Sequence, residues 1–346
     1  MNTADVVVIG DSQTWGINVT QKETWPSALM QVGHVSVYSM SLGGWGPIQY
    51  EILAKDALIL NPRAILVGLY LGNDIFDSCS HVYGTDAYPQ YRRADGNFTE
   101  ALSALHARLK LMDDHTRIDR AHQRLAEMGA VAKVWQKLAG RSVILQTLMA
   151  RGWVPAVPSV DELYEAADVS WAQASPEAAS WYRGRGVSTV MTYGYRGAAV
   201  DLSNLCIRDG VRITREVLAS LKDLSEKRDI RMGVVFIPTK EWVYAAADKD
   251  LRSHVTGEFA NLFKNETSIK KELQEACVKI ELVCVDAADI LVPAAQKGAM
   301  LYKADSDGHP IAQGYRQIAY AGLQALETLG VLHAQQARRG VENTSR

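Results

Sequence analysis

Short apolar segments alternate with amphipathic segments over the first 77 residues and again from residue 209 onwards. The apolar runs have the length and character of buried strands, and we expect them at Asp5–Gly10, His34–Ser39, Ala64–Leu71, Ile230–Pro238 and Ile280–Asp286. Segments with helical spacing lie between or after them, at 24–32, 47–58, 209–228, 268–277 and 311–329. Because strands that alternate with helices are typical of βαβ units, the sequence predicts an α/β fold with a five-stranded parallel sheet.

The middle of the chain has a different pattern. Apolar positions keep helical spacing over 102–112 and again over 118–138, which predicts two amphipathic helices packed on each other. A looser stretch with prolines and tryptophans follows them. We therefore interpret residues 78–208 as a mainly helical insertion that divides a core formed by 1–77 and 209–335. Since it begins close to Asp74, we expect it to cap the active rim and to form part of the substrate cleft. The polar tail, 336–346, is predicted to fray.

Composition narrows the functional classes. The chain has 346 residues and a formal net charge of −2, so no basic field favours nucleic acid or an anionic membrane as a partner. No apolar run reaches the roughly 18 residues that a transmembrane segment needs. No signal peptide precedes the first strand. This fits a cytoplasmic protein if the chain is native as given, and a periplasmic or secreted protein if a leader was removed.

The cysteines give no sign of a metal site or a disulfide scaffold. There are four, and none lies in a CxxC pair. Cys277 and Cys284 flank an expected helix-to-strand turn, so a bridge between them is feasible in an oxidising compartment. We expect reduced, packed cysteines instead. An EF-hand register from Lys303 places lysine at the first ligand position, so no metal is predicted.

Small and polar residues follow the carboxyl ends of the predicted strands, where open parallel sheets bind their ligands. In chain order these segments are Gly10-Asp11-Ser12, “SMSLGGWG” at 39–46, Gly72-Asn73-Asp74, “PTKEWVY” at 238–244 and “DSDGHP” at 305–310. Each has a simple structural explanation. Ser12 is a good helix N-cap, the glycine pair permits a tight turn, and Asn73-Asp74 are common turn residues. His309 taken alone fits an exposed loop.

Taken together, the same residues supply every group that a nucleophilic serine needs. The Ser12 hydroxyl requires a base, and the imidazole of His309 has a suitable pKa range. A carboxylate must hold the histidine in the correct tautomer. The oxyanion formed on attack requires donors, which the backbone N–H at Gly44 and the amide of Asn73 would provide. No cofactor is needed for this chemistry.

These segments resemble the ordered sequence blocks of the SGNH hydrolases, also called GDSL-type esterases and lipases. “GDS” at 10–12 matches the first block and implies that Ser12 is the nucleophile and an oxyanion donor. “SMSLGG” and “GND” match the next two and imply oxyanion roles for Gly44 and Asn73. “DGHP” matches the last and implies that His309 is the base. The resemblance also implies a three-layer α/β/α sandwich, and it leaves the insertion unexplained.

Two departures from the family pattern concern the first and last blocks. The leucine of the family name is absent, because Gln13 follows Ser12. The aspartate usually found three residues before the histidine is replaced by Ser306, with Asp305 and Asp307 on either side. An Asp-x-His spacing is similar to that of SGNH-like polysaccharide O-acetyltransferases. We expect Asp307 to orient His309, because an aspartate two residues back can fold toward the imidazole, and Asp305 to be exposed or capping.

The leading hypothesis is a serine ester hydrolase that removes acetyl or other short acyl groups from a carbohydrate or small alcohol. An O-acetyltransferase with the same site, acylating a polysaccharide hydroxyl, is the alternative. Trp45 and Lys240 are candidate substrate-binding residues, since Trp45 lies beside the oxyanion glycine and an aromatic ring can stack on a sugar. A non-catalytic flavodoxin-like binding module is a distant third, because the loop after the first strand has few glycines and His309 would have no role.

Overall fold

The computed structural model describes residues 3–112, 147 and 160–332. Five parallel strands form its central sheet in the order β2-β1-β3-β6-β7. Their bounds are β1 Val6–Gly10, β2 Val37–Ser41, β3 Ala64–Tyr70, β6 Arg231–Ile237 and β7 Val283–Asp286. The predicted α/β fold and five strands are confirmed, although β2 begins three residues later and β7 is shorter than expected. The expected second insertion helix and the polar tail lie outside the described residues.

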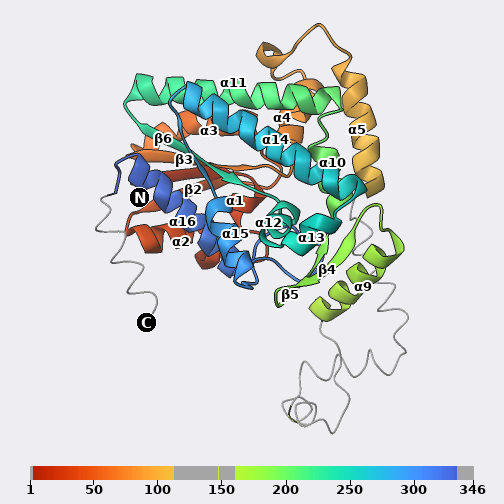
Figure 1. The fold of residues 1–346 in the computed structure, drawn as a ribbon. Helices are drawn as coiled ribbons and strands as arrows, with labels where there is room; N and C mark the ends of the chain where they lie inside the picture. Colours follow the sequence, from red (N-terminus) through yellow and green to blue (C-terminus); the bar gives the residue numbers. More distant parts are fainter. Residues whose placement is uncertain (1–2, 113–146, 148–159, 333–346) are drawn as a thin grey trace.

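Helices cover both faces of the sheet, which gives the three-layer arrangement seen in Figure 1. One layer contains α2 Trp25–Gly33, α15 Ala288–Gln296 and α16 Ala312–Thr328. The other contains α3 Pro47–Ala57, α4 Asp74–Gly84, α11 Leu205–Arg228 and α14 Gly257–Lys279. Short elements lie between the longer ones along the chain: α1 Ser12–Trp15, α12 Lys240–Ala247, α13 Lys249–His254, and the 3-10 turns η1 Gln21–Glu23, η2 Leu58–Leu60 and η3 Pro89–Tyr91.

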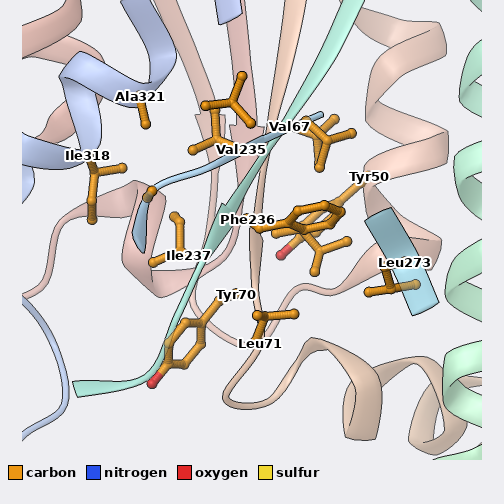
Figure 2. Packing of buried hydrophobic residues seen from close by; sticks show 14 of the residues in the cluster. Tyr50, Val67, Tyr70, Leu71, Val235, Phe236, Ile237, Leu273, Ile318 and Ala321 are labelled. Carbon is orange, nitrogen blue, oxygen red and sulfur yellow. The ribbon is translucent and has the colours of Figure 1, made fainter. Parts of the chain in front are cut away.

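The three inner strands are buried along almost their whole length because helices cover both of their faces. Every residue of β1 and β3 is buried, and so is β6 apart from Arg231. Figure 2 shows side chains of β3 and β6 packed among Tyr50, Leu273 and Ile318, which come from both helical layers. Burial on two faces explains why these strands have continuous apolar sequences rather than alternating ones. The edge strand β2 is partly exposed and has a more polar sequence.

The insertion contains an antiparallel hairpin that the sequence analysis did not predict. Its strands are β4 Ser180–Gly184 and β5 Val187–Met191, joined by a two-residue turn. Both turn residues, Arg185 and Gly186, have positive φ angles of 51° and 78°, as a type I′ turn requires. Helices α5 Phe98–Met112, α9 Val160–Ala174 and α10 Tyr193–Ala199 complete the described part of the insertion. The sequence analysis predicted a mainly helical insertion over 78–208, and this hairpin adds two strands to it.

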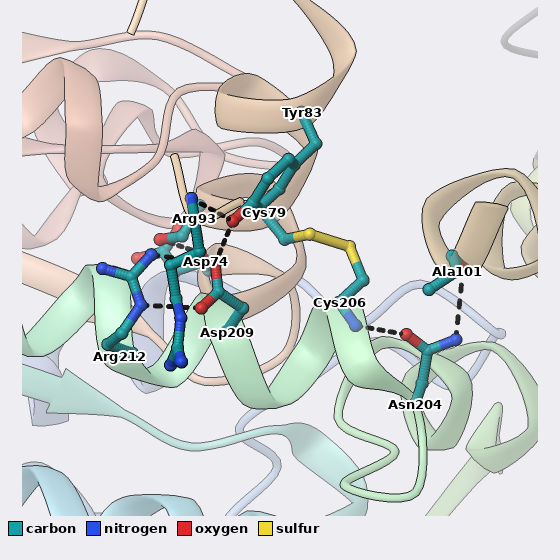
Figure 3. The surroundings of a disulfide bond; sticks show 10 residues. Asp74, Cys79, Tyr83, Arg93, Ala101, Asn204, Cys206, Asp209 and Arg212 are labelled. Carbon is teal, nitrogen blue, oxygen red and sulfur yellow. Dashed lines mark hydrogen bonds and ion pairs between the residues drawn. A yellow bond between two sulfur atoms is a disulfide. The ribbon is translucent and has the colours of Figure 1, made fainter. Parts of the chain in front are cut away.

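Both cysteine pairs form disulfides, which corrects the expectation of reduced thiols. Cys277 in the last turn of α14 is bonded to Cys284 in β7, with Cα atoms 6.2 Å apart. The chain reverses direction between them, with Glu281 at a φ of 53°. Cys79 in α4 is bonded to Cys206 at the start of α11 (Figure 3), with Cα atoms 5.6 Å apart. Beside this second bridge, the Tyr83 hydroxyl donates to Asp209, which also accepts from Arg212.

Candidate active site

Ser12 lies just past the end of the inner strand β1, as the first residue of α1. The N-cap of this short helix is Asp11, whose carboxylate accepts a hydrogen bond from the backbone N–H of Gln13 at 2.9 Å. The N-cap explanation for Ser12 is therefore wrong by one residue. The Ser12 side chain is left partly exposed at the rim of the sheet, where a substrate can reach its hydroxyl.

Three side chains form a hydrogen-bonded chain at this rim. The Ser12 Oγ lies 2.9 Å from Nε2 of His309, and Nδ1 of His309 lies 2.7 Å from Oδ1 of Asp307. An ionised carboxylate only accepts hydrogen bonds. Nδ1 must therefore carry the proton, which leaves Nε2 as an acceptor for the Ser12 hydroxyl. His309 and Asp307 are only 16% and 15% exposed, so solvent screens this contact little.

The charge of Asp307 is stabilised by its neighbours. Burial opposes ionisation, but the hydrogen bonds and charge of His309, together with a bond from Asn18, lower the pKa of Asp307 well below its usual range. The Asn18 amide donates to the second carboxylate oxygen at 2.9 Å. Asn18 was not among the predicted site residues. Its only sequence signal is its place in the loop that follows α1.

The structure separates the two candidate aspartates. Asp307 contacts the imidazole, whereas Asp305 accepts from the backbone N–H of Asp307 at 2.9 Å. Asp305 is 4% exposed, so of the two predicted roles solvent exposure is wrong, whereas its contact with the Asp307 N–H is of the capping kind. It stabilises the turn that carries Asp307 and His309.

Lys240 also supports this turn and does not bind substrate in the way that the sequence suggested. It is fully buried, and its ammonium group donates to the carbonyl oxygens of Asp305 and Asp307, both at 3.0 Å. A third bond reaches the Thr189 hydroxyl of β5 at 3.2 Å. Burial lowers the pKa of Lys240, and the neighbouring acidic groups oppose this effect. With its three donors engaged, Lys240 has none left for a ligand.

The loop after β2 brings the glycine pair to the nucleophile. A Cβ atom placed on Gly43 would lie 3.7 Å from the Cβ of Ser12, and Gly44 has a φ of +81° that favours glycine. Trp45 is partly exposed and packs against the core with its buried part. These positions are compatible with an oxyanion role for the Gly44 backbone and with a sugar-stacking role for Trp45. Both roles remain predictions.

Asn73 follows β3 on the same rim as Ser12. One hydrogen of its amide group is donated to Asp77 at 2.9 Å, and the second is available because the group carries two. Because of this hydrogen bond, Asp77 fixes the orientation of the Asn73 amide. Burial, together with the charge of Asp11, raises the pKa of Asp77 well above its usual range. The described residues contain no cluster of three or more histidine, cysteine or acidic side chains arranged to hold a metal ion.

The similarity of this chain to known proteins is one of fold. No family model and no curated protein matches the chain. Among solved structures it is similar to a G-D-S-L family protein from Desulfitobacterium hafniense DCB-2, with 11% identity, 93% and 98% of the two chains covered and a TM-score of 0.42. It is also similar to the acetyl xylan esterase AlAXEase, with 9% identity, coverage of 93% and 99% and a TM-score of 0.41.

An extracellular lipase from Streptomyces rimosus is a further structural neighbour, with 10% identity, 94% and 100% of the two chains covered and a TM-score of 0.39. The chain thus resembles the SGNH hydrolases in its sequence blocks, and it has members of the G-D-S-L group among its structural neighbours. At such low identity, any role of individual residues depends on the geometry of this chain's own site.

Proposed function

We propose that the protein is a serine ester hydrolase that works through an acyl-enzyme on Ser12. The observation that carries this proposal is the hydrogen-bonded chain from Ser12 through His309 to Asp307, with distances of 2.9 and 2.7 Å. Nucleophile, base and orienting carboxylate have the order and the contacts that this chemistry requires. The acyl group is acetyl or another short chain, and the alcohol is a carbohydrate or a small alcohol.

The mechanism follows from these contacts. Nε2 of His309 takes the hydroxyl proton while the Ser12 Oγ attacks the ester carbonyl carbon. The negative charge on the carbonyl oxygen is stabilised by the backbone N–H groups of Ser12 and Gly44 and by the free amide hydrogen of Asn73. His309 then gives its proton to the departing alcohol oxygen. Water then attacks the acyl carbon and loses a proton to His309, and His309 gives this proton to the Ser12 Oγ as the carboxylic acid leaves.

An O-acetyltransferase would use the same first half of this reaction. A sugar hydroxyl would then replace water as the acceptor of the acyl group. The Asp307-x-His309 spacing supports this second candidate, because it is similar to the spacing in SGNH-like polysaccharide O-acetyltransferases. Adding sugar acceptors to the ester assay separates the two, since only a transferase forms a new sugar ester.

The two disulfides bear on where the protein works. The disulfides Cys79–Cys206 and Cys277–Cys284 are typical of oxidising compartments, so they support the periplasmic or secreted alternative. Among the helices that the structure describes, none combines the length and the apolar character needed to cross a bilayer.

The direct test is the Ser12→Ala variant, compared with Ser41→Ala. Ser41 ends the neighbouring strand β2 and its hydroxyl contacts Ser39, so it is a rim serine outside the hydrogen-bonded chain. Ser12→Ala should lose 4-nitrophenyl acetate hydrolysis by at least about 10⁴-fold and should lose labelling by a fluorophosphonate. Its thermal midpoint should stay close to that of the wild type. Labelling of Ser12→Ala, or equal loss in Ser41→Ala, would exclude the proposal.

A further inference from the structure

Arg196 reaches the site from the insertion. It belongs to α10 and lies against the turn that carries Asp307 and His309, since a Cβ on Gly308 would be only 2.9 Å from its Nη2 atom. The insertion therefore places a cation beside the two residues that activate Ser12. The sequence analysis did not single out Arg196.

The guanidinium group is held by aromatic rings rather than by acidic partners. It lies over the rings of Tyr70 and Tyr195, at 5.5 and 5.2 Å from their centroids. Its Nε atom is buried and has no hydrogen-bond partner. No ion pair found among the described residues includes Arg196, although Glu241 and Asp307 lie near enough for their charges to act on it, and the side chain as a whole is partly exposed.

The acidic groups that face Arg196 already contact other donors. They come from three elements: Asp77 of α4, Glu241 of α12 and Asp307 of the histidine turn. Asp77 accepts from Asn73, and both oxygens of Asp307 accept from His309 and Asn18. One oxygen of Glu241 accepts from the backbone and hydroxyl of Thr192, while the other is buried without a partner. Among the described residues, none of these three carboxylates is paired with the fork of Arg196 donors, so the fork can take up an acidic group of a ligand.

We propose that Arg196 binds a carboxylate of the substrate, so that the preferred ester carries an acidic group next to the scissile bond. This inference rests on the proposed esterase function. A planar guanidinium matches the two oxygens of a carboxylate, and such bidentate contacts are strong where water is partly excluded. A single negative charge fits better than a phosphate dianion, because Asp307 and Glu241 lie close and Lys240 is fully engaged.

The acidic group can lie in either half of the ester. A uronic acid places it in the alcohol half, and a succinyl ester places it in the acyl half. The kinetic test therefore uses three matched substrates: an acetylated methyl glucuronoside, a succinylated methyl glucoside and an acetylated methyl glucoside as the neutral reference. If the protein prefers the glucuronoside, the acidic group belongs to the alcohol half of the ester; if it prefers the succinyl ester, the group belongs to the acyl half.

The variants are Arg196→Gln and Arg196→Lys, with Arg183→Gln as the matched control. Arg183 also lies over an aromatic ring, that of Trp181 at 4.2 Å, but it is exposed on the hairpin. We expect wild-type protein to prefer one acidic ester over the neutral one. In Arg196→Gln the ratio of the two kcat/KM values should fall about 10- to 100-fold, as the loss of a charged hydrogen bond implies. Lysine should restore part of this ratio, and Arg183→Gln should leave it unchanged.

A binding measurement keeps this test independent of hydrolysis. Calorimetric titration with methyl glucuronoside and with monomethyl succinate, against methyl glucoside, reports recognition of the carboxylate even if Ser12 is not a nucleophile. Binding of one acid that is lost in Arg196→Gln supports the proposal. Equal rates and equal binding for acidic and neutral compounds would overturn it. A parallel loss on all three esters would also overturn it, because Arg196 would then only support the histidine turn.

Discussion

The Ser12 Oγ and the His309 Nε2 are 2.9 Å apart, yet the two segments that carry them are held in place in different ways. We call the segment around Ser12 the nucleophile side and the turn with Asp307 and His309 the base side. The nucleophile side is built from contacts between residues that are close in sequence. Buried strand β1 ends at Gly10, Asp11 caps α1, and Ser12 follows at once. The base side is a turn whose position depends on side chains far away in the sequence.

The distant supports of the base side come from three parts of the chain. Lys240 of α12 binds two carbonyl oxygens of the turn, and Asn18 of the first core segment binds Asp307. The insertion contributes Asp168, which accepts from the backbone N–H of Ser306 at 2.9 Å, and Thr189. The comparison teaches that the nucleophile can be recognised locally, whereas the base is placed by the whole fold, including the insertion.

The largest effect should come from the base side itself. Asp307→Asn replaces the carboxylate that holds His309 in its tautomer, so kcat for an ester should fall by about 10⁴-fold. Asp305→Asn is the matched control. Its side-chain oxygen can still accept from the Asp307 N–H, so the loss should be less than about tenfold. Steady-state kinetics with 4-nitrophenyl acetate measure both, and similar losses in the two variants would contradict the separation of roles.

A smaller loss is expected at the oxyanion position. Asn73→Ala should lower kcat by about 10²- to 10³-fold and leave KM nearly unchanged, because the amide contacts the charge that forms during the reaction. Asp77→Ala removes the partner of the amide but keeps the amide itself, so its kcat should fall less. If Asn73→Ala raises only KM, Asn73 binds substrate instead.

The third prediction concerns the support of the base side. Lys240→Met leaves two carbonyl oxygens and the Thr189 hydroxyl without their buried donor, so the free energy of unfolding should fall by about 3 kcal/mol. Lys297→Met, at an exposed position, should be neutral. Denaturant unfolding measures both. If the free energy of unfolding is unchanged in Lys240→Met, other contacts are enough to hold the turn.

The smallest effect concerns the nucleophile side and depends on pH. Burial raises the pKa of Asp11 from its usual value to about 6. Between about pH 4 and pH 6 the folded chain therefore holds a proton that the unfolded chain has lost, so this residue makes stability fall as pH rises through that range. Asp11→Asn keeps the oxygen that caps α1 and removes the titration.

We expect Asp11→Asn to be more stable than the wild type at pH 7, by on the order of 2 kcal/mol, and equal to it near pH 4. Thermal unfolding at several pH values measures the difference. A variant that is less stable at every pH would show that the charge of Asp11 favours folding.

The sequence predicted most of the fold and the parts of the site that have local signals. Continuous apolar runs identified the five strands. Ser12 and Asn73 come soon after two of them, and His309 comes after the last strand and the helix α15. The Asp307 contact was also expected, because Gly308 permits the turn that brings its carboxylate two residues forward. These features depend on chain segments of a few residues.

Features that depend on distant contacts were missed. Lys240 looked available because nothing near it in the sequence indicates that it is buried under the histidine turn. Asp305 looked exposed for the same reason. The hairpin has a local signal, because Arg185-Gly186 lies between aromatic and β-branched residues, but an antiparallel hairpin does not belong to an alternation of strands and helices. The pairing of Cys79 with Cys206, 127 positions apart, has no local signal at all.

That disulfide makes the insertion a closed covalent loop whose two ends meet at its base. Ser12 lies before the loop and His309 after it, so the two halves of the site stay on one molecule even if a protease cuts the chain inside the insertion. Closing a loop of more than about 100 residues also lowers the conformational entropy of the unfolded chain. In the chain-entropy model this raises the free energy of unfolding by about 5 kcal/mol. A cut within the insertion therefore leaves the nucleophile and its base joined, and Asp168 and Thr189 of the insertion can still hold the histidine turn.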